Sequence, residues 1–172
     1  MPRLLLLLPT TTYRTEAFLN AARRLGVEMT VGSDRAHVLA ERRPSGTLAL
    51  NFRQPAEAAS AVVEFARTRP IDAVVGTDDA TTVLAATLSA ALLRPHNSVA
   101  AADAARDKHQ MRKILSRNGV PVPRYVLRSL DDDPMVEARR MVFPCVAKPL
   151  MLSASRGVIR ADDEAQFVGA VR

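Results

Sequence analysis

The sequence predicts an α/β fold in which a doubly wound parallel sheet is followed by the first part of a smaller α+β domain. The segment Leu4–Leu8 is continuously apolar and Ile71–Val75 is nearly so, as expected of parallel strands that are covered on both faces. Between residues 1 and 94, strand-like and helix-like segments alternate. This β-α-β-α order is typical of a sheet that carries helices on both faces.

The first domain is expected to continue from the strand Leu4–Leu8 into a helix at Arg14–Leu25, which would bury Leu25 and end at Gly26. A second helix is expected at Pro55–Arg69, because proline is favoured in the first turn of a helix. The other expected elements are the strands Val27–Val31, Thr47–Asn51 and Ile71–Val75, a helix at Thr82–Leu93 and a short helical piece at Ala36–Glu41.

Polar residues follow several of these strands. Ligands of doubly wound sheets bind beyond the carboxyl ends of the strands, so these side chains could bind a substrate amine or hydroxyl. Alternatively, Thr77 or Asp78 could only cap the next helix, and the sequence leaves both interpretations open. The candidate substrate-binding residues are Thr11, Asp34, Thr77, Asp78 and Asp79.

The second part of the chain begins after a break at Pro95-His96-Asn97. Helices are expected from Ser98 to Ala105 and over Asp107–Asn118, and Gly119-Val-Pro-Val-Pro123 ends the second of them. A run of acidic residues before Pro134 and another from Asp162 each begin a further helix, since acids are favoured at helix N-termini. One small antiparallel sheet is expected from Arg124–Arg128, Pro144–Lys148 and Gly157–Ala161.

Lys148 stands at the end of an apolar strand, which Pro149 stops because proline has no N–H to donate. A loop of small and polar residues, Ser153–Gly157, follows. A lysine beside such a loop is a candidate phosphate cradle, because the lysine supplies charge and the backbone N–H groups supply shape. The alternative is a β-hairpin whose lysine only reaches water. Arginine is the default cation of this chain, and the choice of lysine here favours the phosphate interpretation.

The composition narrows the classes of function. The chain has a net charge of +6, but it shows no helix-turn-helix, zinc-finger or RNP signature. The Gly-x-Gly-x-x-Gly fingerprint and the Walker loop are missing, which argues against a nicotinamide cofactor and a P-loop. No apolar run reaches the ~18 residues of a membrane helix. The single cysteine, Cys145, permits no internal disulfide, and we expect a cytoplasmic protein.

Four segments, in this order, resemble the opening of an ATP-grasp fold. They are Asp107-Lys108-His-Gln-Met-Arg112, Gly119-Val-Pro-Val-Pro123, Phe143-Pro-Cys-Val-Ala-Lys148-Pro149 and Ser153-Ala-Ser-Arg-Gly157-Val158. The family includes biotin carboxylase, carbamoyl-phosphate synthetase and carboxylate–amine ligases. Residues 1–105 are similar to the pre-ATP-grasp domain that precedes this fold. We therefore expect a pre-ATP-grasp domain at 1–94, connecting helices at 95–121 and an incomplete ATP-grasp lid subdomain at 122–172.

The resemblance implies that Lys108 and Lys148 bind the nucleotide, and that Lys148 contacts the α- and β-phosphates of ATP. The loop that closes over the phosphates would consist of Ser153, Ala154, Ser155, Arg156 and Gly157. Such enzymes use ATP and Mg²⁺ to convert a small carboxylate into an acylphosphate, which an amine or another nucleophile then attacks. In the family the magnesium ligands come later than residue 172. We therefore expect the N-terminal part of a longer ligase, inactive alone, with no catalytic residue or metal ligand assigned in this chain.

Two other classes of function remain open at this point. The first is a non-catalytic module that binds a nucleotide or another small molecule on a doubly wound α/β fold. The second is a basic nucleic-acid-binding protein, which would show steep salt dependence. Under the ligase hypothesis the partners are ATP and a small carboxylate, with no nucleic acid and no membrane, and a homo-oligomeric assembly is left open.

Overall fold

The computed structural model describes residues 1–9, 15–35 and 46–171. The chain divides into two compact units, Met1–Asp103 (unit 1) and Ala104–Arg172 (unit 2). The helical piece expected at 36–41 and the candidate residue Thr11 lie outside the described residues.

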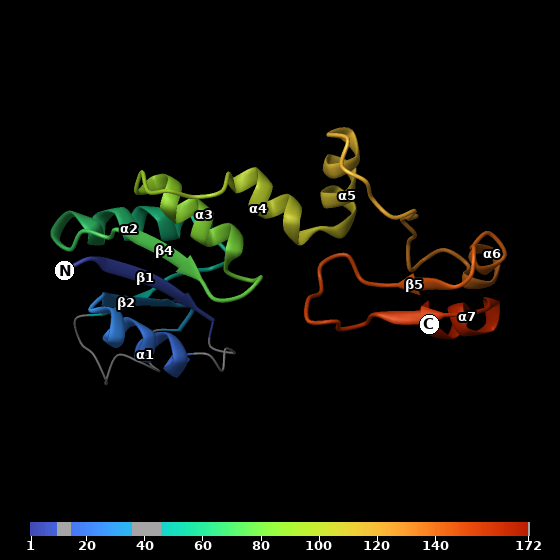
Figure 1. Cartoon of the computed structure of the whole chain (residues 1–172), viewed down its shortest axis with the longest axis horizontal. Helices are drawn as coiled ribbons and strands as arrows, with labels where there is room; N and C mark the ends of the chain where they lie inside the picture. The colour runs from blue at the N-terminus through green and yellow to red at the C-terminus, as the bar shows by residue number, and fades with distance from the viewer. Residues whose placement is uncertain (10–14, 36–45, 172) are drawn as a thin grey trace. The chain divides into compact units, whose positions relative to one another are not determined.

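Unit 1 is built on a parallel sheet of four strands in the order β3-β2-β1-β4 (Figure 1). The strands are β1 (Arg3–Leu8), β2 (Glu28–Ser33), β3 (Thr47–Ala49) and β4 (Ala73–Gly76). At the centre of the sheet, Leu6 of β1 pairs with Val31 of β2 on one side and with Val75 of β4 on the other. The expected parallel sheet, with the first and fourth strands in it, is therefore confirmed.

Helices cover both faces of this sheet (Figure 1). Helix α1 (Thr15–Leu25) lies on one face, whereas α2 (Pro55–Thr68) and α3 (Thr82–Ala91) lie on the other. Pro55 occupies the first turn of α2, where its missing N–H leaves no hydrogen bond unmade. The doubly wound arrangement predicted from the alternation of elements is confirmed.

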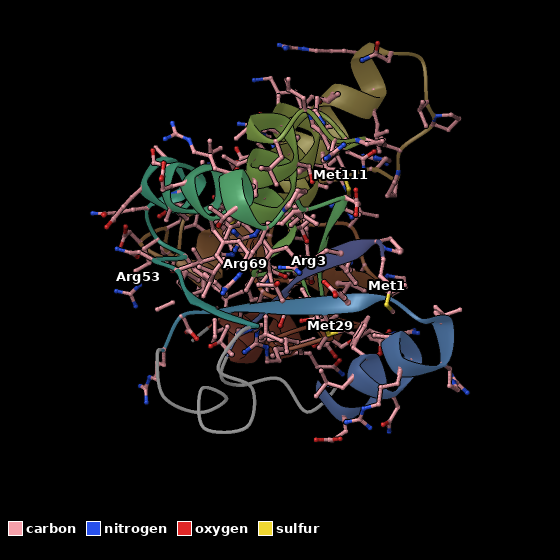
Figure 2. All side chains as sticks on the ribbon, turned by 90° about the vertical axis from the view of Figure 1, so that its left-hand side faces the viewer. Met1, Arg3, Met29, Arg53, Arg69 and Met111 are labelled. Carbon is pink, nitrogen blue, oxygen red and sulfur yellow. The ribbon has the colours of Figure 1, made fainter. Side chains whose placement is uncertain are left out.

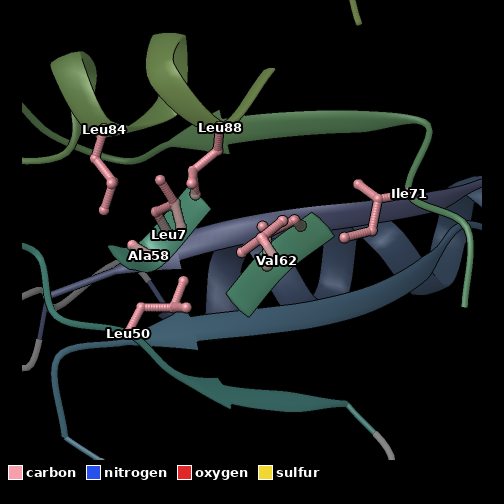
Figure 3. Close-up of a cluster of buried hydrophobic side chains, with 8 residues drawn as sticks. Leu7, Leu50, Ala58, Val62, Ile71, Leu84 and Leu88 are labelled. Atoms are coloured by element: carbon pink, nitrogen blue, oxygen red, sulfur yellow. The ribbon is translucent and has the colours of Figure 1, made fainter. Parts of the chain in front are cut away.

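Two apolar clusters fill the spaces between the sheet and its helices. The larger one joins alternate residues of β1 to α2 and α3 through Leu5, Leu7, Val62 and Leu88, all completely buried (Figure 3). The smaller one places Leu6 and Leu8 against Phe18 of α1. Because successive side chains of a strand point to opposite faces, the unbroken leucine run of β1 supplies both clusters.

The expected burial of Leu25 is wrong, because its side chain is 76% exposed. The chain leaves α1 through Gly26, which has φ +63°, and the N–H groups of Gly26 and Val27 donate to the carbonyls of Arg23 and Ala22. This is the Schellman arrangement of a helix end. It turns the chain toward β2 at Leu25, and Ala22 is the buried residue of this turn.

Unit 2 is smaller and has its own core. Helix α4 (Val99–Arg106) leads into it, followed by α5 (Lys108–Arg117), α6 (Pro134–Ala138), β5 (Cys145–Ala147), β6 (Ile159–Ala161) and α7 (Glu164–Val171). The strands β5 and β6 form an antiparallel pair, and the core beside them consists of Ala138, Ala161, Phe167 and Val168. No helix in the described part of the chain is long and apolar enough to cross a membrane.

The strand expected at Arg124–Arg128 is wrong, and the sheet of unit 2 has two described strands rather than three. Side chains hold this segment where a strand ladder was expected. The ring of Tyr125 lies edge-on to His109, at 5.7 Å between centroids, and below the guanidinium of Arg112 on α5. Arg128 forms an ion pair with the buried carboxylate of Glu137 on α6. These contacts hold residues 124–128 between α5 and α6, although the segment belongs to neither sheet of the described residues.

Candidate functional site

The carboxyl edge of the unit 1 sheet contains a change of direction between β1 and β4. The chain passes outward from β1 through β2 to β3, and then returns to the other side of β1 to form β4. The helices that follow β1 and β4 lie on opposite faces (Figure 1). In doubly wound sheets a crevice opens at such a point, and ligands bind there.

Thr77 and Asp78 are used by the fold at this edge. The hydroxyl of Thr77 is buried and donates to the carbonyl of Leu7 at 3.1 Å, so it joins the ends of β4 and β1. The carboxylate of Asp78 accepts from the N–H of Ala80 at 3.0 Å, and its carbonyl accepts from the hydroxyl of Thr81 at 2.9 Å. Neither residue caps α3. Both stabilise the turn that precedes this helix.

Asp79 differs from its two neighbours. Its side chain is exposed and makes no hydrogen bond or ion pair with the described residues. Its carboxylate is therefore available to an amine or hydroxyl beyond the sheet edge. Sequence reasoning named Asp79 but missed Thr81, which is completely buried. A Cβ on Gly76 would lie 2.6 Å from the hydroxyl of Thr81, so the turn packs against a position that only glycine can occupy.

Asp34 lies elsewhere along the same edge, after β2. It lines a pocket of about 460 Å³ together with the last residue of β3, Ala49, and the residues that follow this strand, Leu50, Asn51, Phe52 and Arg53. The hydroxyl of Ser33 approaches the Asp34 carboxylate at 3.5 Å, and Arg53 projects outward from unit 1 (Figure 2). Asn51 and Arg53 were missed from the sequence, although the general rule about strand ends pointed to them.

In unit 2, Lys148 directly follows β5. Alternation along the strand places it on the side of the half-exposed Val146, away from Cys145, which packs against the core. The side chain of Lys148 is exposed and makes no hydrogen bond or ion pair with the described residues. Its ammonium group is therefore available to bind an anion.

The loop Ser153–Gly157 begins with a tight turn. The N–H of Arg156 donates to the carbonyl of Ser153 at 3.2 Å, and that of Val158 donates to the carbonyl of Ser155 at 3.2 Å. Ala154 and Ser155 have φ of +54° and +57°, a conformation that costs an L-residue roughly 1–2 kcal/mol. The N–H groups of Ala154, Ser155 and Gly157 make no hydrogen bond with the described residues. Backbone donors in such turns can bind an anion.

Gly157 closes the base of this loop against Pro149. It has φ +67°, and a Cβ at this position would lie 2.8 Å from Cγ of Pro149. We expect Gly157→Ala to lower the free energy of unfolding of unit 2 by about 1–2 kcal/mol, because alanine must adopt left-handed backbone and also displace the proline. The measurement is urea unfolding followed by far-ultraviolet circular dichroism.

The control for that substitution is Gly169→Ala in α7. A Cβ there meets nothing within 4 Å, and alanine is favoured over glycine inside a helix by about 0.5–1 kcal/mol. The two variants should therefore change stability in opposite directions. A stabilising Gly157→Ala would contradict the close contact with Pro149.

Lys108, the other lysine of the predicted nucleotide site, is already engaged. Its ammonium donates to the carbonyl of Leu150 at 2.9 Å and to that of Leu152 at 2.6 Å. Both carbonyls belong to residues 150–152, which lie between Pro149 and the loop Ser153–Gly157 and form the arm of this loop. The structure thus brings Lys108 together with the arm of the loop, a contact across about forty residues that no sequence pattern indicated.

Cys145 has a structural role in unit 2. Its side chain packs against the core of unit 2. Burial, together with the nearby negative charge of Asp162, raises the pKa of the thiol above its ordinary value, so the thiol stays protonated at neutral pH. A protonated thiol is a poor nucleophile and metal ligand. Within the described ranges, no three His, Cys, Asp or Glu side chains gather around a common metal position.

Comparisons with known proteins agree with this architecture. A family model described as the ATP-grasp N-terminal domain matches residues 19–96. The L-amino acid ligase from Bacillus licheniformis is similar over 100% of this chain and 42% of its own, with 22% identity and a TM-score of 0.71. No curated protein sequence matches the chain.

Two further solved structures are similar over almost the whole chain. Carboxyaminoimidazole ribonucleotide synthase from Aspergillus clavatus, complexed with ATP, matches 99% of this chain and 44% of its own, with 18% identity and a TM-score of 0.67. Phosphoribosylglycinamide synthetase from Anaerococcus prevotii matches 98% and 40%, with 17% identity and a TM-score of 0.57. The chain thus spans about two fifths of the length of these structures. The resemblance to the N-terminal portion of ATP-grasp enzymes is confirmed at the level of the fold.

Proposed function

We propose that this chain is the N-terminal part of an ATP-dependent ligase of the ATP-grasp type. One observation carries the proposal: Lys148, an exposed lysine with no partner among the described residues, precedes a loop in which the N–H groups of Ala154, Ser155 and Gly157 make no hydrogen bond with those residues. Lysine is a common phosphate ligand that acts as a point charge. Two of the similar structures are a ligase and a synthetase, and a third is complexed with ATP, which supports the choice of ligand.

The proposed division of labour follows the segments of the chain. Residues 1–94 form the pre-ATP-grasp domain and residues 122–172 form part of the nucleotide lid. The helices of residues 95–121 connect the two. In the first domain, Asp79 and Asp34 bind an amine or hydroxyl of a substrate, since a carboxylate attracts a cation and accepts from donors. In the lid, Lys148 and the N–H groups of Ala154, Ser155 and Gly157 bind the phosphates. The single cysteine supports a cytoplasmic enzyme.

The proposed reaction has two steps. A carboxylate oxygen of the substrate attacks the γ-phosphorus of ATP, and the bond to the β-phosphate oxygen breaks, so that ADP leaves with the bonding electrons. An amine or other nucleophile then attacks the carbonyl carbon of the acylphosphate, and inorganic phosphate leaves as the nucleophile loses its proton. Catalysis of such transfers consists mainly of positioning and charge neutralisation.

Magnesium is the usual partner of ATP, and the proposal assigns no described residue to it. Such an ion is commonly held by one or two carboxylates together with phosphate oxygens and waters. Lys148 and the loop amides supply positive charge and hydrogen-bond donors, which suit phosphate oxygens rather than a cation. In this proposal Lys148 and the loop amides therefore contact the phosphates.

Hydroxylamine trapping tests this proposal. In the enzyme that carries this chain, ATP and Mg²⁺ with a panel of small carboxylates should release ADP, and hydroxylamine should convert the acylphosphate into a hydroxamate. ADP release should depend on the carboxylate. Tight ATP binding without any ADP release on the whole panel would instead favour a non-catalytic nucleotide-binding module. Retention on DNA that falls steeply with salt would favour the nucleic-acid alternative.

A further inference from the structure

We propose that Lys108 is a positioning residue. It holds the arm of the loop Ser153–Gly157, that is residues 150–152, on helix α5 before any nucleotide binds. This inference deepens the proposed function, on which its kinetic part rests. The resemblance implies a direct nucleotide contact for Lys108. The geometry points to a different partner, because its ammonium donates to the carbonyls of Leu150 and Leu152, at 2.9 and 2.6 Å.

We call the two hydrogen bonds from Lys108 to these carbonyls the tether. The first turn of α5 fixes the position from which Lys108 makes them. The carboxylate of Asp107 accepts from the N–H groups of His109 and Gln110, at 2.8 and 3.0 Å. Such a cap stabilises the first turn of a helix, and Lys108 is the first residue of that turn. The lysine therefore projects from a rigid element.

The tether satisfies two carbonyls on the arm of the loop. An ammonium group has three N–H donors, and two of them are used here. Hydrogen bonds from a charged donor are stronger than those between neutral groups. The arm gains order from these bonds, and one donor of Lys108 remains.

The loop consequently has two fixed points and a free tip. Pro149 packs against Gly157 at the base, and Lys108 holds the arm at Leu150 and Leu152. The left-handed residues Ala154 and Ser155 lie beyond both points, with their N–H groups free. A preformed loop binds a ligand more tightly, because the apparent affinity decreases when fewer molecules are in the binding-competent conformation.

Amide hydrogen exchange on the nucleotide-free chain tests the tether directly. The reporters are the N–H groups of Arg156 and Val158, which are hydrogen-bonded within the loop. In Lys108→Met, which keeps the length of the side chain but removes its charge, these amides should exchange at least about tenfold faster, as expected for the loss of ~1.5 kcal/mol or more. Lys108→Arg should restore slow exchange, since a guanidinium can also donate to two carbonyls.

Two matched variants serve as controls in the same experiment. Lys113→Met removes a lysine of the same helix that has no partner among the described residues, and Lys148→Met removes the proposed phosphate ligand. Both should leave loop exchange unchanged. If Lys108→Met also accelerates exchange in α7, it has loosened the whole unit, and Lys108→Gln, which retains one donor group, takes its place. Unchanged exchange in the loop of the Lys108 variant overturns the proposal.

Steady-state kinetics of the enzyme that carries this chain separates positioning from direct contact. A positioning role predicts that Lys108→Met raises KM for ATP about tenfold or more and leaves kcat near the wild-type value, because saturating ATP itself orders the loop. A fall in kcat of the same size would assign Lys108 to the reacting phosphates and overturn the positioning role. Failure of the proposed function would appear differently, as absent ATP binding with the exchange result intact.

Discussion

Replacing Lys148 by alanine should weaken ATP binding roughly ten- to hundredfold and nearly abolish turnover of the enzyme that carries this chain. The reason is that a charge-assisted hydrogen bond to phosphate contributes about 1.5–3 kcal/mol. The free energy of unfolding should change by less than ~0.5 kcal/mol, because the side chain is exposed and makes no polar contact with the described residues. Calorimetric titration with ATP and a thermal unfolding curve measure the two effects.

Lys148→Arg sharpens this experiment, and Lys113→Ala is its control. Arginine keeps the charge but presents it as a planar fork, which does not replace a compact ammonium in a fitted site. We therefore expect Lys148→Arg also to lose affinity. Lys113 is likewise without a partner among the described residues, but it lies on α5 and should be replaceable. Wild-type affinity in both Lys148 variants would remove the main residue of the proposed nucleotide site.

The largest expected loss of stability comes from Leu7→Ala. Leu7 is completely buried at the centre of the sheet, where it packs with residues of α2 and α3 (Figure 3). Truncation of such a leucine removes its transfer free energy and leaves a cavity, at a cost of about 3–5 kcal/mol. The measurement is urea unfolding of the chain, with a lower midpoint for the transition of unit 1.

Leu25→Ala provides the matched comparison. The same substitution is made in the same unit, but Leu25 is 76% exposed at the end of α1. Its effect should stay within ~0.5 kcal/mol, as for most surface positions. A large loss of stability in this variant would mean that the sequence-based prediction of an inward Leu25 was right and that the observed helix end is wrong.

Local patterns predicted much of unit 1 correctly because its elements obey local rules. The leucine run of β1 is buried on both faces, and the proline at the start of α2 and the glycine after α1 mark real helix ends. The prediction of a strand at Arg124–Arg128 failed because this segment is held by side chains of α5 and α6, and strand propensity does not describe such contacts. A segment can be extended without having a neighbour to pair with.

The candidate site divides in the same way. Lys148 and its loop could be recognised from a short stretch, since strand, proline, small residues and glycine follow one another. The engagement of Lys108 could not, because Leu150 and Leu152 are distant in sequence and contribute only their carbonyls. Every residue has a carbonyl, so the sequence carries no mark of this contact. The structural use of Thr77 was hidden for the same reason, as its acceptor is the carbonyl of Leu7.

The central position of β1 has a consequence during synthesis of the chain. Leu4 pairs with Met29 of β2 on one side and with Ala73 of β4 on the other. The apolar strand β1 is therefore synthesised before both of its neighbours, and β4 is synthesised much later. At roughly 5–20 residues per second on the ribosome, that delay is on the order of ten seconds. During this interval the leucine run is an uncovered, aggregation-prone strand. Protection of the nascent chain by a chaperone would therefore matter most before β4 emerges.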